Sequence, residues 1–285
     1  IMDKRINLGF VTIKGIQSSE TFFESKIKNL IKDGYNITVF SEKKSRSVNS
    51  YNHHFQWKIP KSPFLKLIYL SFGLTRLVIG SPFRTLKFLT KSINSNKSII
   101  KSFKSLYING YILVVPKLDI LHFGYCTLGI GKEHLGKVMR CKLTTSFRGY
   151  DILNFPLKNQ NCYNLLWNNL DKVHSISEYL YKSSLELGLS KKTPFKIIYP
   201  AIDVKKFGYQ KIIQNKINSP INIISVCRLT WQKGLDYALK AIEILKSESF
   251  NVCFTIIGSG PDYERLHYSC SDLGITDNVF ILGKI

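Results

Sequence analysis

The segments Arg5-Ile-Asn-Leu-Gly-Phe-Val-Thr-Ile13 and Asn36-Ile-Thr-Val-Phe40 decide the fold, together with the helix signals between them. Both are short apolar runs of the kind that forms buried strands. Between them, Thr21-Phe-Phe-Glu24 is a capping box that opens a helix, and Gly34 ends that helix. A strand, a helix and a second strand in close succession predict the start of a doubly wound parallel sheet.

The α/β alternation occurs twice along the 285 residues. Further strands are expected up to Tyr199, and residues 205–220 are polar and aperiodic. A second series follows, with strands at 221–226, 252–257 and 279–282 and helices at 234–246 and 262–273. We therefore predict two Rossmann-like domains, 1–205 and 206–285. A three-stranded sheet with an uncovered edge makes a poor independent domain, so we expect the second to be incomplete.

The composition is that of a globular protein, with 44% hydrophobic and 21% charged residues. Six widely spaced cysteines are expected to be reduced thiols of a cytosolic protein. The net charge is +22, and residues 43–118 contain 14 Lys or Arg and no Asp or Glu. This stretch should attract a phosphate-rich partner, and charge alone leaves a lipid surface, a nucleic acid or another polyanion possible.

Residues 45–105 interrupt the alternation. Within them, 64–79 is strongly apolar, but Lys66 and Arg76 interrupt the run and it is shorter than the roughly 20 residues of a spanning helix. We therefore expect it not to cross a bilayer. Ser81-Pro82 opens a second helix with an apolar stripe beside a basic one. Such a helix suits docking onto anionic lipid through residues 60–105, or a solvated basic face over an ordinary core helix.

The turn Arg228-Leu-Thr-Trp-Gln-Lys233-Gly234 carries the clearest chemical signal. It connects an expected strand to an expected helix, so it lies at the carboxyl edge of the second sheet. Two cations beside a helix N-terminus favour a diphosphate at that position. Two solvated surface cations are the alternative.

Several motifs in this order resemble the family-four retaining glycosyltransferases of the GT-B type, and the resemblance extends from about residue 5 to the chain end. Some of the N-terminal motifs are similar to the branch that makes colanic-acid-like exopolysaccharides. The motifs are Ser19-Glu-Thr-Phe-Phe23, Asp119-Ile-Leu-His-Phe-Gly124, Ser146-Phe-Arg-Gly-Tyr-Asp151, Val173-His-Ser-Ile-Ser-Glu178, Tyr199-Pro-Ala-Ile-Asp203, Arg228-Leu-Thr-Trp-Gln-Lys233-Gly-Leu-Asp-Tyr-Ala238, Ile256-Ile-Gly258-Ser-Gly260-Pro261 and Asn278-Val-Phe-Ile-Leu-Gly283.

The resemblance implies a fold of two Rossmann-like domains facing a cleft, and transfer of a sugar from a nucleotide-diphosphate sugar with retention at the anomeric carbon. Arg228 and Lys233 would be the catalytic cations that hold the diphosphate and stabilise its developing charge. The sequence contains no Asp-x-Asp and no clustered Cys or His with ligand spacing. We therefore predict no metal and no cofactor, with the nucleotide sugar as substrate.

Four further residues belong to the donor side by this resemblance. Gly258 and Gly260 would let a loop approach the donor closely, because a Cβ would obstruct it. Gly283 and Lys284 fall where family members pass the backbone beside the nucleobase, although a simple turn is equally compatible.

On the acceptor side the candidates are Glu20, His122, Arg148 and Asp151. Glu20 lies in the first strand-to-helix loop, which faces the cleft by topology. His122 is either a cleft residue or a hydrogen-bonded core histidine, and Asp151 is either a cleft residue or a helix cap. Arg148 stands where the family often has His, and it could bind a phosphate or an acidic sugar but could not copy an imidazole.

Together these observations predict a glycosyltransferase of bacterial surface polysaccharide assembly, peripheral on the cytoplasmic face of the plasma membrane, with a lipid-linked glycan acceptor. The family's C-terminal Glu-x7-Glu element would lie beyond Ile285, so we expect the chain as given to be nearly inactive. The alternatives are a non-catalytic membrane- or polyanion-binding domain and a nucleotide-sugar epimerase of the same fold. No RNA-recognition, KH or zinc-finger signature is present, so no nucleic-acid partner is expected.

Overall fold

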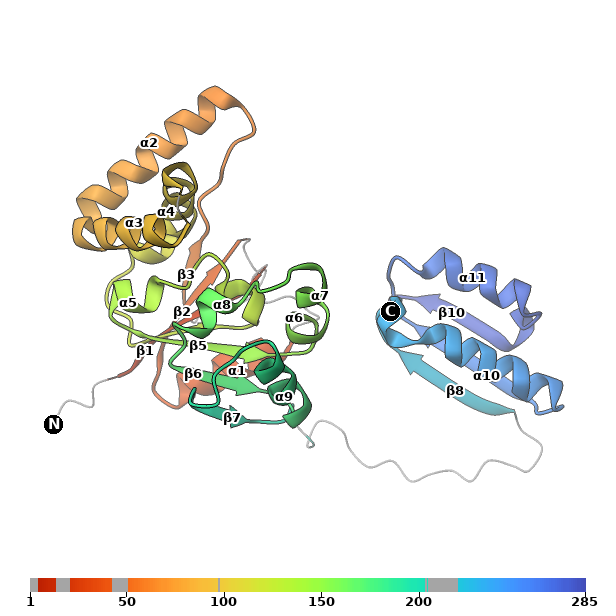
Figure 1. The fold of residues 1–285 in the computed structure, drawn as a ribbon. Coiled ribbons are helices and arrows are strands. Elements are labelled where there is room, and N and C mark those ends of the chain that lie inside the picture. The colour runs from red at the N-terminus through yellow and green to blue at the C-terminus, as the bar shows by residue number, and fades with distance from the viewer. Residues whose placement is uncertain (1–4, 14–20, 43–50, 97, 203, 205–219) are drawn as a thin grey trace. The chain divides into compact units, whose positions relative to one another are not determined.

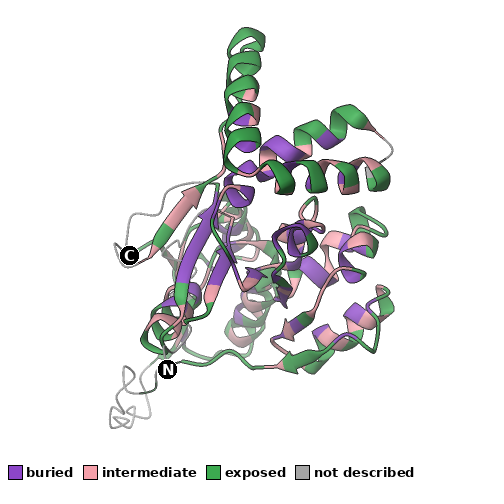
Figure 2. Ribbon diagram, turned by 90° about the vertical axis from the view of Figure 1, so that its left-hand side faces the viewer, coloured by how far each residue is buried: buried purple, intermediate pink, exposed green. Residues whose placement is uncertain are grey.

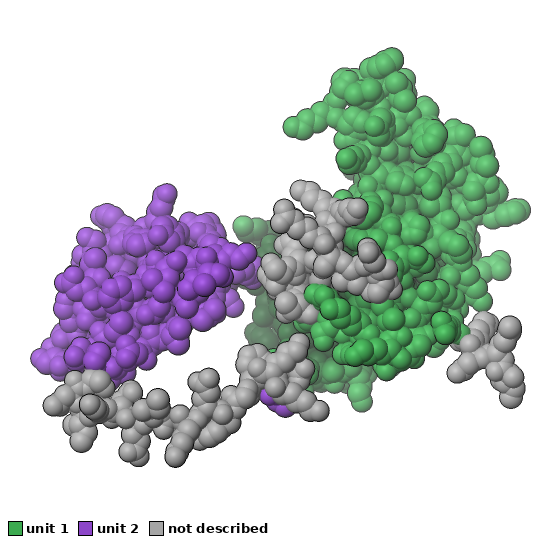
Figure 3. Space-filling view, turned by 180° about the vertical axis from the view of Figure 1, so that it is seen from behind, with its two compact units in different colours: residues 1–202 green, residues 203–285 purple. Residues whose placement is uncertain are grey.

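The computed structural model describes residues 5–13, 21–42, 51–96, 98–202, 204 and 220–285. The chain divides into two compact units, unit 1 (Ile1–Ile202) and unit 2 (Asp203–Ile285), which Figure 3 shows in different colours. The division falls three residues before the boundary expected at 205/206. The polar connection expected at 205–220 lies, except for Pro220, outside the described residues.

Unit 1 contains a seven-stranded sheet in the order β3-β2-β1-β4-β5-β6-β7, and every neighbouring pair is parallel (Figure 1). The doubly wound sheet predicted from the sequence is thereby confirmed. The direction of winding reverses between β1 and β4, which is where folds of this type form their ligand crevice. The strands are β1 (Asn7–Val11), β2 (Asn36–Ser41), β3 (Asn52–Phe55), β4 (Ile120–Phe123), β5 (Lys142–Phe147), β6 (Lys172–Ser175) and β7 (Phe195–Ile197).

Helices cover this sheet on both faces, as a parallel sheet requires. Adjacent residues of β1 show the division: Phe10 packs on Phe23 of α1, whereas Val11 belongs to a larger cluster with Ile112 of α4. The helices are α1 (Thr21–Lys32), α2 (Pro63–Gly80), α3 (Pro82–Asn96), α4 (Ile99–Leu113), the short helix η1 (Cys126–Gly129), α5 (Leu135–Met139), α6 (Tyr150–Leu153), α7 (Phe155–Lys158), α8 (Asn164–Trp167) and α9 (Glu178–Glu186).

The interrupting segment of the sequence forms β3 and then the three helices α2, α3 and α4. The alternating pattern did not predict β3, whose His53 and His54 are half-buried, and it did not predict α4. α3 begins at Pro82, as the Ser81-Pro82 signal predicted. Its buried residues include Phe88, whereas in the predicted apolar stripe of Phe83, Leu86 and Ile93 the first two are exposed and Ile93 is half-buried.

α2 is attached to the rest of unit 1 through a small part of its surface. Gly73 contacts the rings of Tyr107 and Trp57, and Leu77 enters the main core. Figure 2 shows α2, the upright helix at the top of the view, largely in green, in contrast to the purple strands below it. Among the described residues, α2 alone is long and apolar enough to cross a membrane by length and composition, a test that core helices also pass, but only 11% of it is buried.

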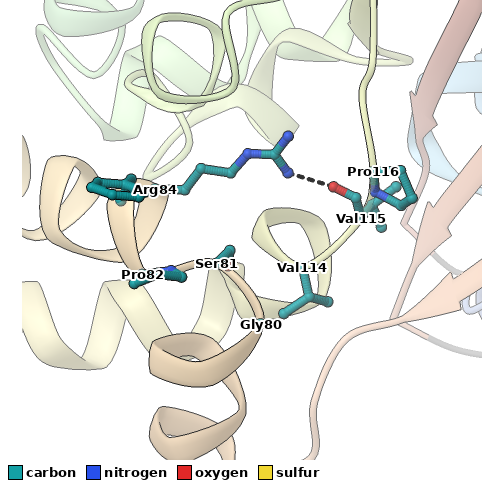
Figure 4. A pocket seen from close by; sticks show the side chains of 8 residues that line it. Gly80, Ser81, Pro82, Arg84, Val114, Val115 and Pro116 are labelled. Carbon is teal, nitrogen blue, oxygen red and sulfur yellow. Dashed lines mark hydrogen bonds between the residues drawn. The ribbon is translucent and has the colours of Figure 1, made fainter.

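The turn between α2 and α3 borders a pocket that is also lined by residues 114–116 (Figure 4). Arg84 donates hydrogen bonds from its guanidinium to the carbonyl oxygens of Leu113 and Val115. It therefore ties α3 to the end of α4. Because residues 114–116 lead into the start of β4, this pocket lies at the amino edge of the sheet.

Unit 2 is a three-stranded parallel sheet in the order β10-β9-β8. Its elements agree closely with the predicted second series, and they pack in a core of their own around Leu239 and Ile256. The elements are β8 (Ile221–Val226), the short helix η3 (Trp231–Lys233), α10 (Leu235–Ser247), β9 (Val252–Ile257), α11 (Tyr263–Asp272), the short helix η4 (Thr276–Asn278) and β10 (Val279–Gly283).

The narrow attachment of α2 gives a test on two neighbouring residues. Leu77 is fully buried, whereas the Ile79 side chain is 77% exposed. We expect Leu77→Ala to lower the free energy of unfolding by about 3 kcal/mol, because it leaves a cavity in the core. Ile79→Ala should change it by less than about 0.5 kcal/mol. Urea unfolding followed by circular dichroism measures both, and equal effects would contradict the attachment through Leu77.

Candidate functional site

The six predicted donor-side residues lie at one edge of unit 2. β8, β9 and β10 are parallel, so the turns that follow them meet at the carboxyl edge of the sheet. The list comprises Arg228 and Lys233 after β8, Gly258 and Gly260 after β9, and Gly283 and Lys284 at the end of β10. The structure therefore brings together the residues that the sequence placed on separate turns.

Arg228 and Lys233 are both exposed. Within the part of the chain that the structure describes, neither side chain makes a hydrogen bond or an ion pair. Lys233 ends η3, and Gly234 follows in the left-handed conformation before α10 begins. The turn thus presents two uncommitted cations beside the N-terminus of a 13-residue helix, an arrangement that suits a diphosphate.

Gly258 and Gly260 have a reason inside the chain for lacking a side chain. A Cβ on Gly258 would lie 1.8 Å from the carbonyl oxygen of Cys227, and one on Gly260 would lie 2.1 Å from that of Leu229. The two glycines therefore let the loop after β9 pack on the loop that carries Arg228. Close approach of this loop to a donor stays a prediction.

Gly283 joins the same edge through its backbone. Its carbonyl oxygen accepts a 2.7 Å hydrogen bond from the N–H of Gly258, and its φ of 73° favours glycine. Lys284 is exposed. Gly283 and Lys284 therefore lie next to the loop after β9 that carries Gly258. Their contact with a nucleobase stays a prediction.

In unit 1, polar side chains gather near the carboxyl ends of β4, β5 and β6. His122 pairs with Thr144 and Ser146 pairs with His174 in the sheet register, so these side chains lie on one face. The Ser146 Oγ lies 3.0 Å from His122 Nε2 and 2.8 Å from His174 Nδ1. From the sequence, His122 could be either a cleft residue or a hydrogen-bonded core histidine. Its burial and its hydrogen bonds favour the second.

Two cations lie next to the hydrogen-bonded side chains of His122, Ser146 and His174. The Lys26 Nζ lies 3.5 Å from His122 Nε2 and 5.5 Å from the ring centroid of Phe10. Arg148 follows β5, and its guanidinium carbon lies 4.1 Å from the ring centroid of Phe22 and 4.6 Å from that of Phe23. Its Nε donates to the carbonyl oxygen of Gly124. Arg148 is therefore held on an aromatic surface at the crevice between β1 and β4.

Burial and positive neighbours control the protonation of these groups. Burial lowers the pKa of His122 well below its ordinary value, and the Lys26 charge adds to that effect. Burial also lowers the pKa of His174. The pKa of Lys26 falls to about 8, first because of burial and second because of the Arg148 charge. Both imidazoles are therefore neutral at pH 7, while Lys26 is mainly charged.

Asp151 supports the loop that carries Arg148. Its carboxylate accepts hydrogen bonds from the N–H groups of Arg148, Gly149 and Cys126 at 2.9–3.0 Å, and its side chain is buried. Burial raises the pKa of its carboxyl group, and these three hydrogen bonds oppose that shift. Asp151 is therefore not the helix cap considered from the sequence, because Gly149 is the N-cap of α6 and Asp151 is the second residue of that helix. Glu20 lies outside the described residues.

Sequence reasoning did not single out Lys26, Ser146 or His174. Ser146 and His174 stand within quoted motifs, so their position at strand ends was the available signal. Lys26 carries no such signal, because it looks like any exposed cation on an amphipathic helix. In the described ranges, no group of three or more His, Cys, Asp or Glu is placed to hold a metal ion. Metal independence stays a prediction.

Comparison with known proteins identifies the class. Residues 210–285 match the model of the family described as "Glycosyl transferases group 1". The chain carries a glycosyl transferases group 1 domain. This glycosyltransferase is 25% identical over 290 residues to amylovoran biosynthesis glycosyltransferase AmsK of Erwinia amylovora, covering 98% of the chain and 70% of AmsK. It is 24% identical over 296 residues to the putative colanic acid biosynthesis glycosyltransferase WcaL of Escherichia coli (strain K12), with the same coverage.

The fold of this glycosyltransferase also has solved counterparts. The crystal structure of Anabaena HepE in complex with UDP-glucose matches 99% of the chain and 70% of HepE, with a TM-score of 0.60 and 13% sequence identity. HepE and similar structures are GT-B glycosyltransferases, so the predicted GT-B-like fold is confirmed. The predicted enzyme class is confirmed as well.

The Lys26 site gives a test of pH-dependent stability. Lys26 has a lower pKa in the folded chain, about 8, than its ordinary value of 10.5, so below pH 8 its charge destabilises the fold. This cost disappears as the pH rises from 8 to 10.5. We expect Lys26→Met to raise the free energy of unfolding at pH 7 by about 1–2 kcal/mol, allowing for a half-exposed side chain. The gain should shrink toward pH 10.

The matched control is Lys28→Met on the same helix. Lys28 is exposed and pairs with Glu24 at 2.7 Å, so its replacement should bring no such gain. Urea unfolding at pH 7 and at pH 10 measures both variants. A gain from Lys26→Met that is the same at both pH values would show that the charge is not its cause.

Proposed function

We propose that this glycosyltransferase moves a sugar from a nucleotide-diphosphate sugar to a glycan acceptor with retention at the anomeric carbon. The observation that carries the proposal is the pair of exposed, uncommitted cations Arg228 and Lys233 beside the start of α10. The crystal structure of HepE, which has a similar fold, is in complex with UDP-glucose.

The chemistry assigned to the two cations is electrostatic. As the glycosidic bond breaks, the sugar becomes oxocarbenium-like and negative charge accumulates on the departing diphosphate. A guanidinium offers two parallel donors to phosphate oxygens, and an ammonium adds a compact charge. Both cations would stabilise the charge of the leaving group, and they take the role that a divalent metal has in other enzymes.

The names of the relatives support a role in bacterial surface polysaccharide assembly. AmsK is named for amylovoran biosynthesis, and WcaL is named for colanic acid biosynthesis. We assign this chain to the same kind of process, with a lipid-linked glycan as acceptor. Such an acceptor is met at the cytoplasmic face of the plasma membrane.

The helices α2, α3 and α4 supply a surface suited to that location. Their exposed apolar side chains include Phe64, Phe72, Phe83 and Ile100, each more than 70% exposed. No acidic residue lies between positions 43 and 118, so the basic side chains around these apolar groups are not offset locally. An apolar surface with a positive border binds anionic lipid, and each cation contributes on the order of 1 kcal/mol.

Replacement of Lys233, the proposed ligand of the donor diphosphate, tests the enzymatic proposal. We expect Lys233→Ala to lower donor hydrolysis by roughly 10²-fold to 10³-fold, because a charge that stabilises the transition state is lost. The assay uses the product of the complete gene with a panel of nucleotide sugars, with and without EDTA. Anomeric configuration of the first-formed product, determined by NMR, reports retention.

The matched control is Lys240→Ala, an exposed cation of α10 that pairs with Glu243. It should keep wild-type turnover. Wild-type turnover in Lys233→Ala would contradict the assignment of Lys233 to the donor diphosphate. Loss of activity in EDTA would contradict the predicted metal independence.

Vesicle flotation tests the membrane proposal. We expect the wild-type chain to float with vesicles of phosphatidylglycerol and phosphatidylcholine, and to bind phosphatidylcholine alone several-fold less. Phe64→Ser combined with Phe72→Ser should reduce flotation several-fold, because two exposed rings of α2 are lost. Leu157→Ser, which changes an exposed residue of α7, should leave flotation unchanged. Equal flotation of all three proteins would contradict vesicle binding through the exposed rings of α2.

A further inference from the structure

Lys26 is a cation in a partly buried site, and no described carboxylate pairs with it. Among the described residues, no carboxylate lies within ion-pair distance of its Nζ. Its Nζ lies 3.5 Å from His122 Nε2 and 5.5 Å from the ring centroid of Phe10. A charge held among such neighbours is unfavourable unless a ligand supplies the counter-charge.

The hydrogen-bonded side chains next to Lys26, which are His122, Ser146 and His174, do not supply this counter-charge. His174 Nε2 lies 3.2 Å from the carbonyl oxygen of Ile198, which can only accept, so this nitrogen carries a hydrogen. The neutral His174 ring then accepts the Ser146 hydroxyl at Nδ1, and the Ser146 oxygen accepts from His122 Nε2. These tautomers are assigned from the network. His122 Nε2 is therefore a donor and cannot accept a hydrogen bond from Lys26.

Three basic side chains thus lie around one part of the sheet edge. Lys26 comes from α1, Arg148 from the end of β5, and His174 from the end of β6, and all three are half-buried. Lys26 and Arg148 carry charged hydrogen-bond donors, whereas the neutral His174 ring gives its one N–H to Ile198 and lies close enough to feel both charges. Arg148 is already oriented by Phe22, Phe23 and the carbonyl of Gly124. Rigid cations of this kind favour binding of an oxyanion.

We propose that Lys26 and Arg148 form, beside His174, a binding site in unit 1 for an oxyanion of the acceptor, either a carboxylate of an acidic sugar or a phosphate group. The inference rests on the proposed function, since it takes the substrate that unit 1 holds to be the acceptor. The donor diphosphate belongs to Arg228 and Lys233, in the other unit. An acidic acceptor would offset the unpaired Lys26 charge, and a neutral sugar would leave it uncompensated.

The experiment follows the ring signals of His174 by NMR at pH 7 in the full chain, assigned with His174→Gln. The probes are glucuronate, inorganic phosphate and neutral glucose, each up to about 50 mM. We expect glucuronate or phosphate to shift the signals saturably, and glucose to cause no saturable shift. The anion that binds more tightly identifies the carboxylate or the phosphate as the source.

Two variants separate this site from the donor site. Lys26→Met should weaken anion binding by at least about tenfold, and Lys26→Arg should restore most of it, because a cation is again present. Lys233→Ala should leave the His174 response unchanged. A melting curve for each variant shows that it is folded.

Three results would overturn the inference: no saturable shift in the wild-type chain, unchanged anion binding in Lys26→Met, or loss of the response in Lys233→Ala. The proposed glycosyl transfer is judged separately, by the donor hydrolysis of Lys233→Ala. A wild-type donor activity that depends on Lys233, together with a failed anion titration, would leave the enzymatic proposal intact and remove the acidic acceptor.

Discussion

The parallel direction of every strand pair is the constraint on which the other features of this protein depend. Because parallel strands all end at the same edge of a sheet, side chains far apart in the sequence meet there. In unit 2 this edge collects Arg228, Lys233 and the glycines of the next turn. In unit 1 it collects His122, Ser146 and His174 from three strands. Chemistry is thereby concentrated at the edges, and the faces of the seven-stranded sheet are left for packing.

Both edges carry positive charge that the described residues do not neutralise. At the turn of unit 2 the cations Arg228 and Lys233 are exposed, so water solvates them. In unit 1 Lys26 is partly buried, and its lowered pKa records the cost. A site that is unfavourable when empty gains more from an oxyanion than a solvated site does. The two edges thus differ in whether their positive charge is solvated or partly buried.

The helices α2 to α4 combine buried residues that pack on the core with an exposed apolar surface. They connect β3 at one side of the sheet to β4 beyond β1, and α2 buries only Gly73 and Leu77 whereas most of the second half of α4 is buried. Leu77 and Phe88 are buried, while Phe64 and Phe83 face outward. A globular protein rarely exposes so much apolar surface without a partner, and the absence of acidic residues over 43–118 favours an anionic one.

The two α/β series, most of the strands, the charge asymmetry and the placing of Arg228 and Lys233 on one strand-to-helix turn could be predicted from the sequence, because strand and helix periodicity and turn residues are local signals. It did not predict β3 or α4. The polar run that contains His53 lacks a strand pattern, and which apolar face of α3 enters the core depends on α4. Tertiary structure alone decided that Asp151 supports a loop, that Gly258 makes room for the Cys227 carbonyl, and that Lys26 lies beside His122. These roles depend on contacts between segments distant in the chain, which no local pattern records.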